Sequence, residues 1–283
     1  MRVAVLGLGA MGQRLAQRLL INNHDVTVWN RSPAAARTLV DAGATLADSP
    51  RAAASNAALV IAMVRDDAAS RRVWLAENDG ALAGLPDTAI AVESSTLSIE
   101  WTTQLAGAFA NKDRQFLDAP VVGSRPQAEA AKLIYLVGGE ARAFAAAKSV
   151  LANLGSTIYH VGPVGSGTKI KLLVNALYGT QVALMAELLG LAKNQNLVCN
   201  QVVEILAAIP ACSLAAKLAA ENMVAENFAP QFPIELVEKD LAYLEMATVS
   251  TAIPVSTSAR TVYQKAIAAG YGMENLTALI KLY

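Results

Sequence analysis

A lysine and an asparagine stand four positions apart in an apolar segment of the C-terminal half. On a helix, Lys171 and Asn175 lie on one face, and Tyr178 falls on the same stripe. Lys169 lies about 200° away from Lys171, so the two lysines cannot face one cleft. A lysine ammonium stays charged near neutral pH, so it can polarise a carbonyl and donate a proton. Periodicity alone, however, also fits a lysine whose stem covers apolar surface and a solvated asparagine.

A glycine-rich turn near the N-terminus predicts a phosphate site. Gly7, Gly9 and Gly12 form the pattern G-x-G-x-x-G between an apolar strand and an amphipathic helix. In this context the glycines permit a tight turn, close approach of a pyrophosphate and close packing of helix on strand. The helix N-terminus then faces the phosphate charge. We therefore expect a dinucleotide on the segment Gly7, Leu8, Gly9, Ala10, Met11 and Gly12.

The end of the second expected strand favours NADP(H) over NAD(H). An acidic residue at this point would bind the ribose 2′-hydroxyl of NAD. The sequence has Asn30, Arg31 and Ser32 instead. A carboxylate would repel a 2′-phosphate, whereas Arg31 offers a guanidinium fork and Ser32 a hydroxyl donor. Arg31 stacked flat on the adenine, or a plain surface arginine, is the alternative.

Two kinds of segment must position these residues. Short β-like runs alternate with helical patterns over the first 160 residues, which predicts a mostly parallel sheet covered on both faces. The runs are Val3–Leu6, Val26–Trp29, Leu59–Met63, Ala89–Val92, Phe116–Asp118, Leu133–Val137 and Thr157–His160. Beyond a glycine-rich stretch the patterns are helical only, near 165–193, 201–208, 213–224, 233–248, 254–269 and 274–282. The fold class is therefore α/β: a Rossmann, doubly wound sheet over residues 1–162, then an all-α domain over 163–283.

Composition argues against several classes of protein. Lysine plus arginine and aspartate plus glutamate number 23 each, so no basic field predicts nucleic acid or an anionic membrane as a partner. His24 and His160 lie far apart and form no metal-ligand spacing, so we expect no metal site. No uncharged stretch of about 20 residues lacks glycine and proline, so we expect no transmembrane helix and a cytoplasmic location.

Three blocks resemble the β-hydroxyacid dehydrogenase family, a 6-phosphogluconate dehydrogenase-like group that includes 3-hydroxyisobutyrate dehydrogenases and glyoxylate/succinic semialdehyde reductases. Val5–Gly12 resembles its nucleotide signature, Asp118–Pro126 its substrate loop, and Gly165–Asn175 its catalytic G-x-G-x-x-x-K-x-x-x-N helix. Glu93–Thr96 is similar to its D-x-S-T segment and Phe232–Leu241 to its K-D-L block. The blocks follow in the family's order over nearly the whole chain.

The resemblance implies roles for the matched residues. Lys171 would protonate the substrate oxygen as hydride arrives from the nicotinamide, and Asn175 would position Lys171 or the substrate. Further cofactor contacts are implied for Met63 and Val64 on the adenosine side, for Thr96, and for Lys239. The helical domains of the family imply a homodimer or homotetramer.

The substrate loop departs from the family at one position. Val122 stands where the family has a serine whose hydroxyl would hold the substrate carboxylate, which leaves backbone N–H groups at Gly123 and Ser124 as donors. Ser124-Arg125-Pro126 resembles the semialdehyde reductase branch. The resemblance thus implies NADPH-dependent reduction of a small aldehyde or keto acid of the glyoxylate/succinic semialdehyde type. A reductase of a less polar carbonyl or imine, and a non-catalytic NADPH-binding protein, are the alternatives.

Overall fold

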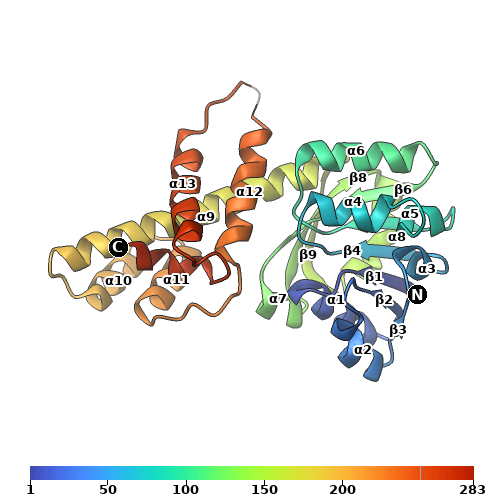
Figure 1. Ribbon diagram of the computed structural model, residues 1–283, viewed down its shortest axis with the longest axis horizontal. Coiled ribbons are helices and arrows are strands. Elements are labelled where there is room, and N and C mark those ends of the chain that lie inside the picture. Colours follow the sequence, from blue (N-terminus) through green and yellow to red (C-terminus); the bar gives the residue numbers. More distant parts are fainter. Residues whose placement is uncertain (249) are drawn as a thin grey trace. The chain divides into compact units, whose positions relative to one another are not determined.

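The chain divides into two compact units in a computed structural model that describes residues 1–248 and 250–283. We call Met1–Lys171 the N-terminal unit and Leu172–Tyr283 the helical unit. Figure 1 labels the elements of both. Each unit has a hydrophobic core of its own, so each is described by itself.

The division between the units falls inside helix α9 (Ser166–Asn194), beyond the boundary expected at residue 162. The first turn of α9 packs so closely on the sheet that it belongs to the N-terminal unit. A Cβ added to Gly167 would lie 2.1 Å from the carbonyl oxygen of Leu136 in the sheet. Lys171 therefore belongs to the N-terminal unit, and the rest of the helix to the helical unit.

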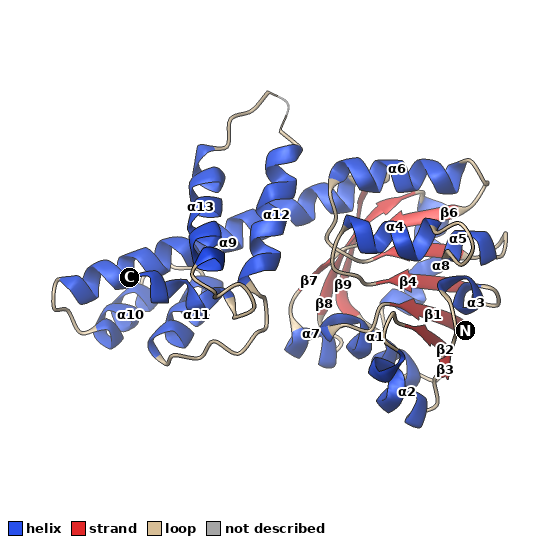
Figure 2. Cartoon of the chain, viewed as in Figure 1, coloured by secondary structure: helices blue, strands red, loops and turns tan. Residues whose placement is uncertain are grey.

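A nine-stranded sheet forms the centre of the N-terminal unit (Figure 2). The strand order is β3-β2-β1-β4-β5-β6-β8-β7, and β9 pairs with β8. All pairs are parallel except β6–β8 and β7–β8. The strands are β1 (Arg2–Leu6), β2 (Asp25–Trp29), β3 (Thr45–Leu46), β4 (Leu59–Ala62), β5 (Ile90–Glu93), β6 (Gln115–Asp118), β7 (Val121–Val122), β8 (Leu133–Gly139) and β9 (Gly155–Gly162). The predicted doubly wound, mostly parallel sheet is confirmed. The prediction lacked β3 and β7, since two paired residues leave no alternating pattern.

Helices cover both faces of this sheet (Figure 2). They are α1 (Ala10–Ile21), η1 (Pro33–Ala36), α2 (Arg37–Asp41), α3 (Pro50–Ala54), α4 (Asp67–Leu75), α5 (Ala81–Gly84), α6 (Ile99–Ala110), α7 (Arg125–Glu129) and α8 (Ala141–Leu151). β4 and β5 are buried along their whole length, as expected for central parallel strands between two helical layers.

Alternation along the strands builds two separate cores. Val3 and Val5 of β1 face the core shared with α1, α2, α7 and α8. Ala4 and Leu6 face the opposite core, shared with α3, α4, α5 and α6, because successive side chains point to opposite faces of a sheet. In that second core, small alanines of the strands lie beneath aromatic side chains of the helices and of β6: Trp74, Trp101, Phe109 and Phe116.

The helical unit contains the remainder of α9 and five further helical segments (Figure 1). These are α10 (Cys199–Ala208), α11 (Leu214–Val224), α12 (Ile234–Met246), α13 (Pro254–Ala268) and η2 (Leu276–Leu282). The predicted all-helical region is confirmed, with one correction. The last segment is a 3₁₀ helix, in which the Ala278 N–H donates to the carbonyl three residues earlier, on Asn275.

α9 is the central helix of this unit's core. Val182, Ala186 and Leu189 are buried in the core that α9 shares with α11, α12, α13 and η2. The Tyr263 hydroxyl of α13 donates to the carbonyl of Gly179 at 2.9 Å, which fixes α13 across α9.

By length and composition alone, α9 could also cross a membrane. No helix of this kind was expected from the sequence. Half of its most apolar 18-residue stretch is buried inside the structure. The central helix of a soluble protein has the same length and composition, so this single helix is weak evidence for a membrane span.

Candidate functional site

The glycine loop has the shape that a pyrophosphate requires. Gly7 has a φ of +96°, and a Cβ there would lie 2.4 Å from the Met63 carbonyl oxygen. A Cβ on Gly12 would lie 1.9 Å from the Gly7 carbonyl oxygen, so α1 and the loop meet where only glycine fits. A Cβ on Gly9 would have nothing within 4 Å. Gly9 is the N-cap of α1, and no side chain there accepts from the first-turn amides. The residues present therefore fit a dinucleotide phosphate group.

Asn30 braces this loop from the end of β2. Its Oδ1 accepts from the Leu8 N–H at 2.9 Å, and its Nδ2 donates to the Ser32 carbonyl at 3.0 Å. Both ends of the amide are therefore engaged within the protein. Arg31 and Ser32 are exposed on the same turn. Asn30 thus shapes the turn, while its two neighbours present their side chains outward.

A pocket of ≈ 350 Å³ opens beside that turn, at the carboxyl ends of β2 and β3. Its lining is Trp29, Asn30, Arg31, Pro33, Leu46, Ala47, Asp48, Arg72 and Asp79. Arg72 and Asp79 form a two-bonded ion pair at 2.6 and 2.8 Å, and the hydrogen bond from Arg72 lowers the pKa of Asp79. The sequence interpretation missed Arg72, because it lies on α4, far along the chain from Arg31.

The predicted contacts after β4 and β5 meet at the same edge of the sheet. Met63 and Val64 follow β4, Thr96 follows β5, and all three are half-buried. The Val64 N–H donates to Ser95 Oγ at 2.8 Å, which ties the two turns together. Because β1 and β5 both pair with β4, this edge also carries the glycine loop.

A buried carboxylate, to which the sequence interpretation gave no role of its own, holds the turn after β5. Glu93 Oε2 accepts from the Ser70 hydroxyl at 2.6 Å and from the Trp74 indole at 2.9 Å. Its Oε1 accepts from the Ser95 N–H at 3.0 Å. Burial raises the pKa of Glu93, and these hydrogen bonds oppose that rise. Glu93 thus fixes the turn that leads to Thr96.

Lys171 and Asn175 are both buried on α9, with exposed fractions of 8% and 4%. Lys169 is exposed, as the angle between the two lysines predicts. This burial argues against the simpler interpretation, in which the lysine and the asparagine are solvated.

Within the helical unit, an aspartate brings together two of the predicted residues. Asn175 Nδ2 donates to Asp240 Oδ2 at 2.5 Å, and Lys239 Nζ lies 2.9 Å from Asp240 Oδ1. Lys239 Nζ also lies 4.7 Å from the centre of the Tyr243 ring. Asp240 is only 3% exposed. The sequence interpretation gave Asp240 no role, although it follows Lys239 directly in the K-D-L block.

The predicted substrate loop forms a tight turn between β7 and α7. Val122 is half-buried in β7 and pairs with Ile134, and Gly123 has a φ of +121°. The Ser124 N–H donates to Gln127 Oε1 at 2.9 Å in the capping box of α7. That bond occupies one of the two backbone amides expected to hold a substrate carboxylate.

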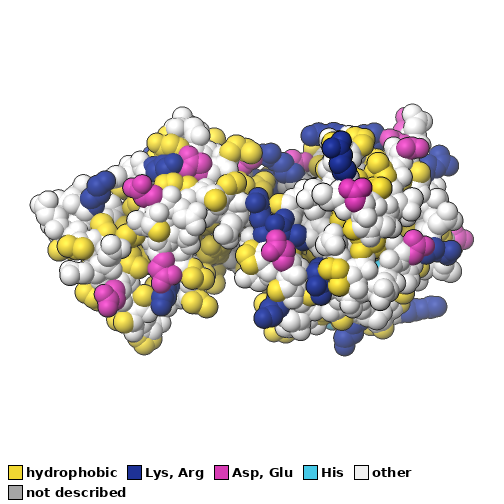
Figure 3. All heavy atoms as spheres, turned by 90° about the horizontal axis from the view of Figure 1, so that it is seen from below, with side chains coloured by type: hydrophobic (Ala, Val, Ile, Leu, Met, Phe, Trp, Pro, Cys, Tyr) yellow, Lys and Arg dark blue, Asp and Glu magenta, His cyan; other side chains and the backbone are white. Residues whose placement is uncertain are grey.

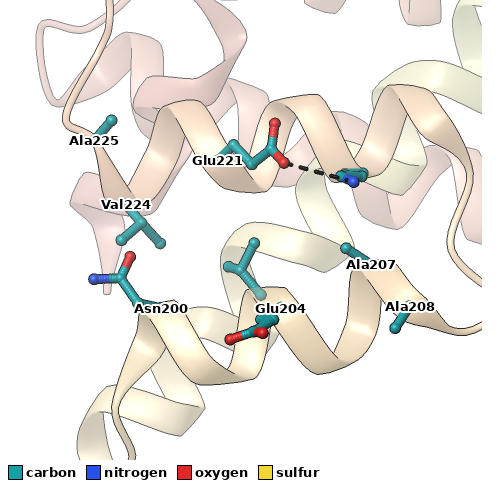
Figure 4. A pocket seen from close by; sticks show the side chains of 9 residues that line it. Asn200, Glu204, Ala207, Ala208, Glu221, Val224 and Ala225 are labelled. Atoms are coloured by element: carbon teal, nitrogen blue, oxygen red, sulfur yellow. Dashed lines mark ion pairs between the residues drawn. The ribbon is translucent and has the colours of Figure 1, made fainter.

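A second pocket, of ≈ 660 Å³, lies between α10 and α11, and none of its lining residues is a predicted site residue (Figure 4). It is lined by Asn200, Val203, Glu204, Ala207, Ala208, Lys217, Glu221, Val224 and Ala225. Lys217 and Glu221 form an ion pair along α11 at 3.9 Å. Among residues 1–248 and 250–283, no group of three or more histidine, cysteine, aspartate or glutamate side chains is arranged to hold a metal.

Comparisons with known proteins cover the whole chain. Residues 2–162 match the family model of the NAD binding domain of 6-phosphogluconate dehydrogenase. Residues 165–283 match that of the NAD-binding domain of NADP-dependent 3-hydroxyisobutyrate dehydrogenase. The chain is 33% identical to the uncharacterized oxidoreductase YfjR of Bacillus subtilis, over 99% of both proteins. It is 30% identical to glyoxylate/succinic semialdehyde reductase 1 of Arabidopsis thaliana, over 99% of this chain and 98% of the plant protein. A solved 3-hydroxyisobutyrate dehydrogenase from Salmonella typhimurium is similar over 100% of both chains, with 25% identity and a TM-score of 0.91.

Proposed function

Because the chain belongs to the β-hydroxyacid dehydrogenase family and is an NADP-dependent oxidoreductase, we propose that it reduces a small aldehyde or keto acid to the hydroxy acid. The leading substrates are glyoxylate and succinic semialdehyde, the compounds in the name of the Arabidopsis relative. Lys171 is the general acid of this proposal, and Asn175 positions it.

The burial of Lys171 is the observation that carries the proposal. Lysine is almost never fully buried unless its ammonium has a polar partner, so a buried lysine on an apolar helix marks a site built around its charge. The side chain lies on an apolar helix, one turn before an asparagine that is itself buried and bound to Asp240. A buried ammonium and a fixed side-chain amide, one turn apart on an apolar helix, are suited to bind a carbonyl oxygen and its carboxylate.

The chemistry balances with the residues present. NADPH, when bound, would supply the hydride that the carbonyl carbon accepts. The Lys171 ammonium donates its proton to the carbonyl oxygen, which becomes the hydroxyl, and the neutral amine recovers a proton from solvent. In the oxidative direction the amine removes the hydroxyl proton. Asn175, held through its Nδ2 by Asp240, keeps its orientation during both steps.

The nucleotide's phosphates are assigned to the glycine loop and its 2′-phosphate to Arg31. The open space at Gly9, the exposed guanidinium of Arg31 and the pocket beside it support this assignment. Ser32 adds a hydroxyl on the same turn, and Met63, Val64, Thr96 and Lys239 remain the other proposed cofactor contacts.

Turnover over a panel of substrates tests the proposal. NADPH consumption is measured with glyoxylate, succinic semialdehyde, an apolar aldehyde and a cyclic imine. Faster turnover of the two acids supports the proposal. If none of these carbonyls or imines is turned over, the protein is a non-catalytic NADPH-binding protein.

A second candidate rests on Val122. Its apolar side chain replaces a hydroxyl in the substrate loop, and the capping box engages the Ser124 amide. Both features reduce the donors for a substrate carboxylate, which favours a less polar carbonyl or an imine. Preferential turnover of the apolar aldehyde or the imine in the panel identifies this activity.

We also propose that the protein assembles as a homodimer or homotetramer through α9. Hydrophobic side chains lie at the surface over the helical unit (Figure 3). Five leucines of α9 are more than a third exposed: Leu173, Leu177, Leu184, Leu188 and Leu191. Their spacing of three, four or seven positions places them along one face of the helix, and exposed apolar faces of this kind mark interfaces. Light scattering with Leu184→Glu tests it, since a monomeric variant is expected.

A further inference from the structure

A carboxylate at the end of β6 is bound to the start of the helix that carries Lys171. Asp118 is completely buried, with 0% exposure. Its Oδ1 accepts from the Gly165 N–H at 2.7 Å, and its Oδ2 accepts from the Thr168 N–H at 2.8 Å. The Thr168 hydroxyl donates to the same Oδ2 at 3.1 Å. One side chain therefore satisfies two backbone amides at the N-terminus of α9.

The ionised form of Asp118 fits these partners. The Gly165 and Thr168 N–H groups donate to its two oxygens, and an ionised carboxylate accepts at both. Burial raises the pKa of Asp118, and the hydrogen bonds from Thr168 and Gly165 oppose that rise without cancelling it. A negative charge is further stabilised by the dipole at a helix N-terminus. With both oxygens engaged by backbone donors, the contact acts as a clamp on the first turn of α9.

The carboxylate has no room to move. A Cβ on Gly138 of β8 would lie 2.3 Å from Asp118 Oδ1, and a Cβ on Gly167 of α9 would lie 3.0 Å from Oδ2. Glycine at both positions lets the strand, the carboxylate and the helix meet without a gap. The first turn of α9 therefore packs directly against the end of β6.

We propose that Asp118 is a positioning residue for Lys171. Lys171 follows Thr168 by three positions, about 4.5 Å along the helix axis, on the same buried side of α9. The backbone of Asp118 also begins the segment that leads to the substrate loop at Val122. The main chain of Asp118 thus leads into the proposed substrate loop, and its side chain holds the helix that carries the proposed proton donor. The inference rests on the proposed role of Lys171.

The contact between Asp118 and the start of α9 should affect kcat more than the affinity for NADPH. A general acid must lie within hydrogen-bond reach of the atom that it protonates, and a misplacement of about 1 Å costs about 10²-fold in rate. Asp118 makes no hydrogen bond to the glycine loop among those of the described residues. Loosening the clamp should therefore reduce kcat and leave the affinity for NADPH unchanged.

Asp118→Asn is the direct test, because it keeps the shape and turns one acceptor into a donor that faces an N–H. We expect kcat to fall by about tenfold or more, with the Kd for NADPH unchanged and faster hydrogen exchange of the amides of residues 166–171. Ser213→Ala is the control. Ser213 caps α11 by accepting from the Ala216 N–H at 3.1 Å, and it belongs to no predicted site. That variant should lose stability and keep kcat.

Each other outcome overturns the inference. If Asp118→Asn lowers the Tm and leaves kcat unchanged, Asp118 is merely structural. If kcat falls and the Kd for NADPH rises as well, Asp118 acts on nucleotide binding. If Asp118→Asn does not fold, Thr168→Val removes the hydroxyl bond to Asp118 and keeps both backbone N–H bonds. The Thr102 hydroxyl, 3.3 Å from the Thr168 hydroxyl, keeps its own bond to the Ser98 carbonyl. Thr168→Val should lower kcat by a smaller factor that Thr168→Ser restores, and an unchanged kcat overturns the proposal. Lys171→Ala in the same assay separates the two claims: its full activity refutes the proposed function, whereas its inactivity beside a fully active Asp118→Asn refutes only this inference.

Discussion

The side chain of Asn30 accepts a hydrogen bond from the backbone N–H of Leu8, at 2.9 Å. This bond joins the turn after β2 to the glycine loop after β1. A second bond, from the Gly7 N–H to the Trp29 carbonyl at 2.9 Å, lies beside it. The two segments proposed to contact the cofactor therefore form one braced unit, in which Arg31 is exposed.

Asn30→Ala should weaken NADPH and NADH binding to a similar extent. The variant removes a bond that shapes the loop for the pyrophosphate, which both nucleotides share. A hydrogen bond of this kind contributes about 0.5–1.5 kcal/mol, or about two- to twelvefold in Kd. Calorimetric titration with both nucleotides measures the effect. A loss confined to NADPH would show that Asn30 contacts the 2′-phosphate itself.

Arg31→Ala should weaken NADPH binding and leave NADH binding nearly unchanged. A charge-assisted contact to the 2′-phosphate contributes about 1.5–3 kcal/mol, or roughly 10- to 150-fold in Kd. The same titrations measure it, with Arg37→Ala as the control, since Arg37 is exposed on α2 and does not line the pocket. Equal losses for both nucleotides would indicate that Arg31 stacks on the adenine.

Lys171→Ala should bind NADPH normally and lose turnover by about 10²–10⁴-fold, the contribution typical of general acid catalysis. Lys169→Ala is the matched control, because this exposed lysine lies two positions away on the other side of α9. Single-turnover kinetics at saturating NADPH separate the chemical step from binding. An inactive Lys169 variant beside an active Lys171 variant would move the proton donor to the opposite face of the helix.

Val122→Ser should lower the KM for glyoxylate or succinic semialdehyde. One restored hydrogen bond to a charged carboxylate contributes about 1.5–3 kcal/mol. Steady-state kinetics of the variant and the parent with the two acids and an apolar aldehyde measure it. Unchanged kinetics for the acids together with lost turnover of the apolar aldehyde would favour the less polar substrate class.

Local patterns were enough to predict the sheet, the glycine loop and the phase of α9. Each depends on a short-range rule: apolar alternation, the strand–glycine–helix order, and the 100° step that separates Lys169 from Lys171. The two-residue strands β3 and β7 leave no such pattern. The 3₁₀ form of η2 was missed because its apolar spacing also suits an α-helix.

The supporting carboxylates could not be predicted in the same way. Asp118 reaches Thr168 across 50 positions, and Asn175 reaches Asp240 across 65. The sequence near either aspartate does not predict its hydrogen-bond partner, because such pairs form only when the sheet and the helices pack. Glu93 illustrates the same point, because its donors Ser70 and Trp74 come from a helix that precedes it in the chain.

The alanine and aromatic core beneath α4 and α6 also determines which part of the protein tryptophan fluorescence can monitor. Its three tryptophans, Trp29, Trp74 and Trp101, all precede residue 172, so intrinsic tryptophan emission arises from the N-terminal unit alone. Trp74 and Trp101 are buried in that core, whereas Trp29 lines the pocket beside Arg31. Denaturation followed by tryptophan emission will therefore record the loss of the sheet and remain silent to the melting of the helical unit. Circular dichroism, to which the helices of both units contribute, is the complementary probe.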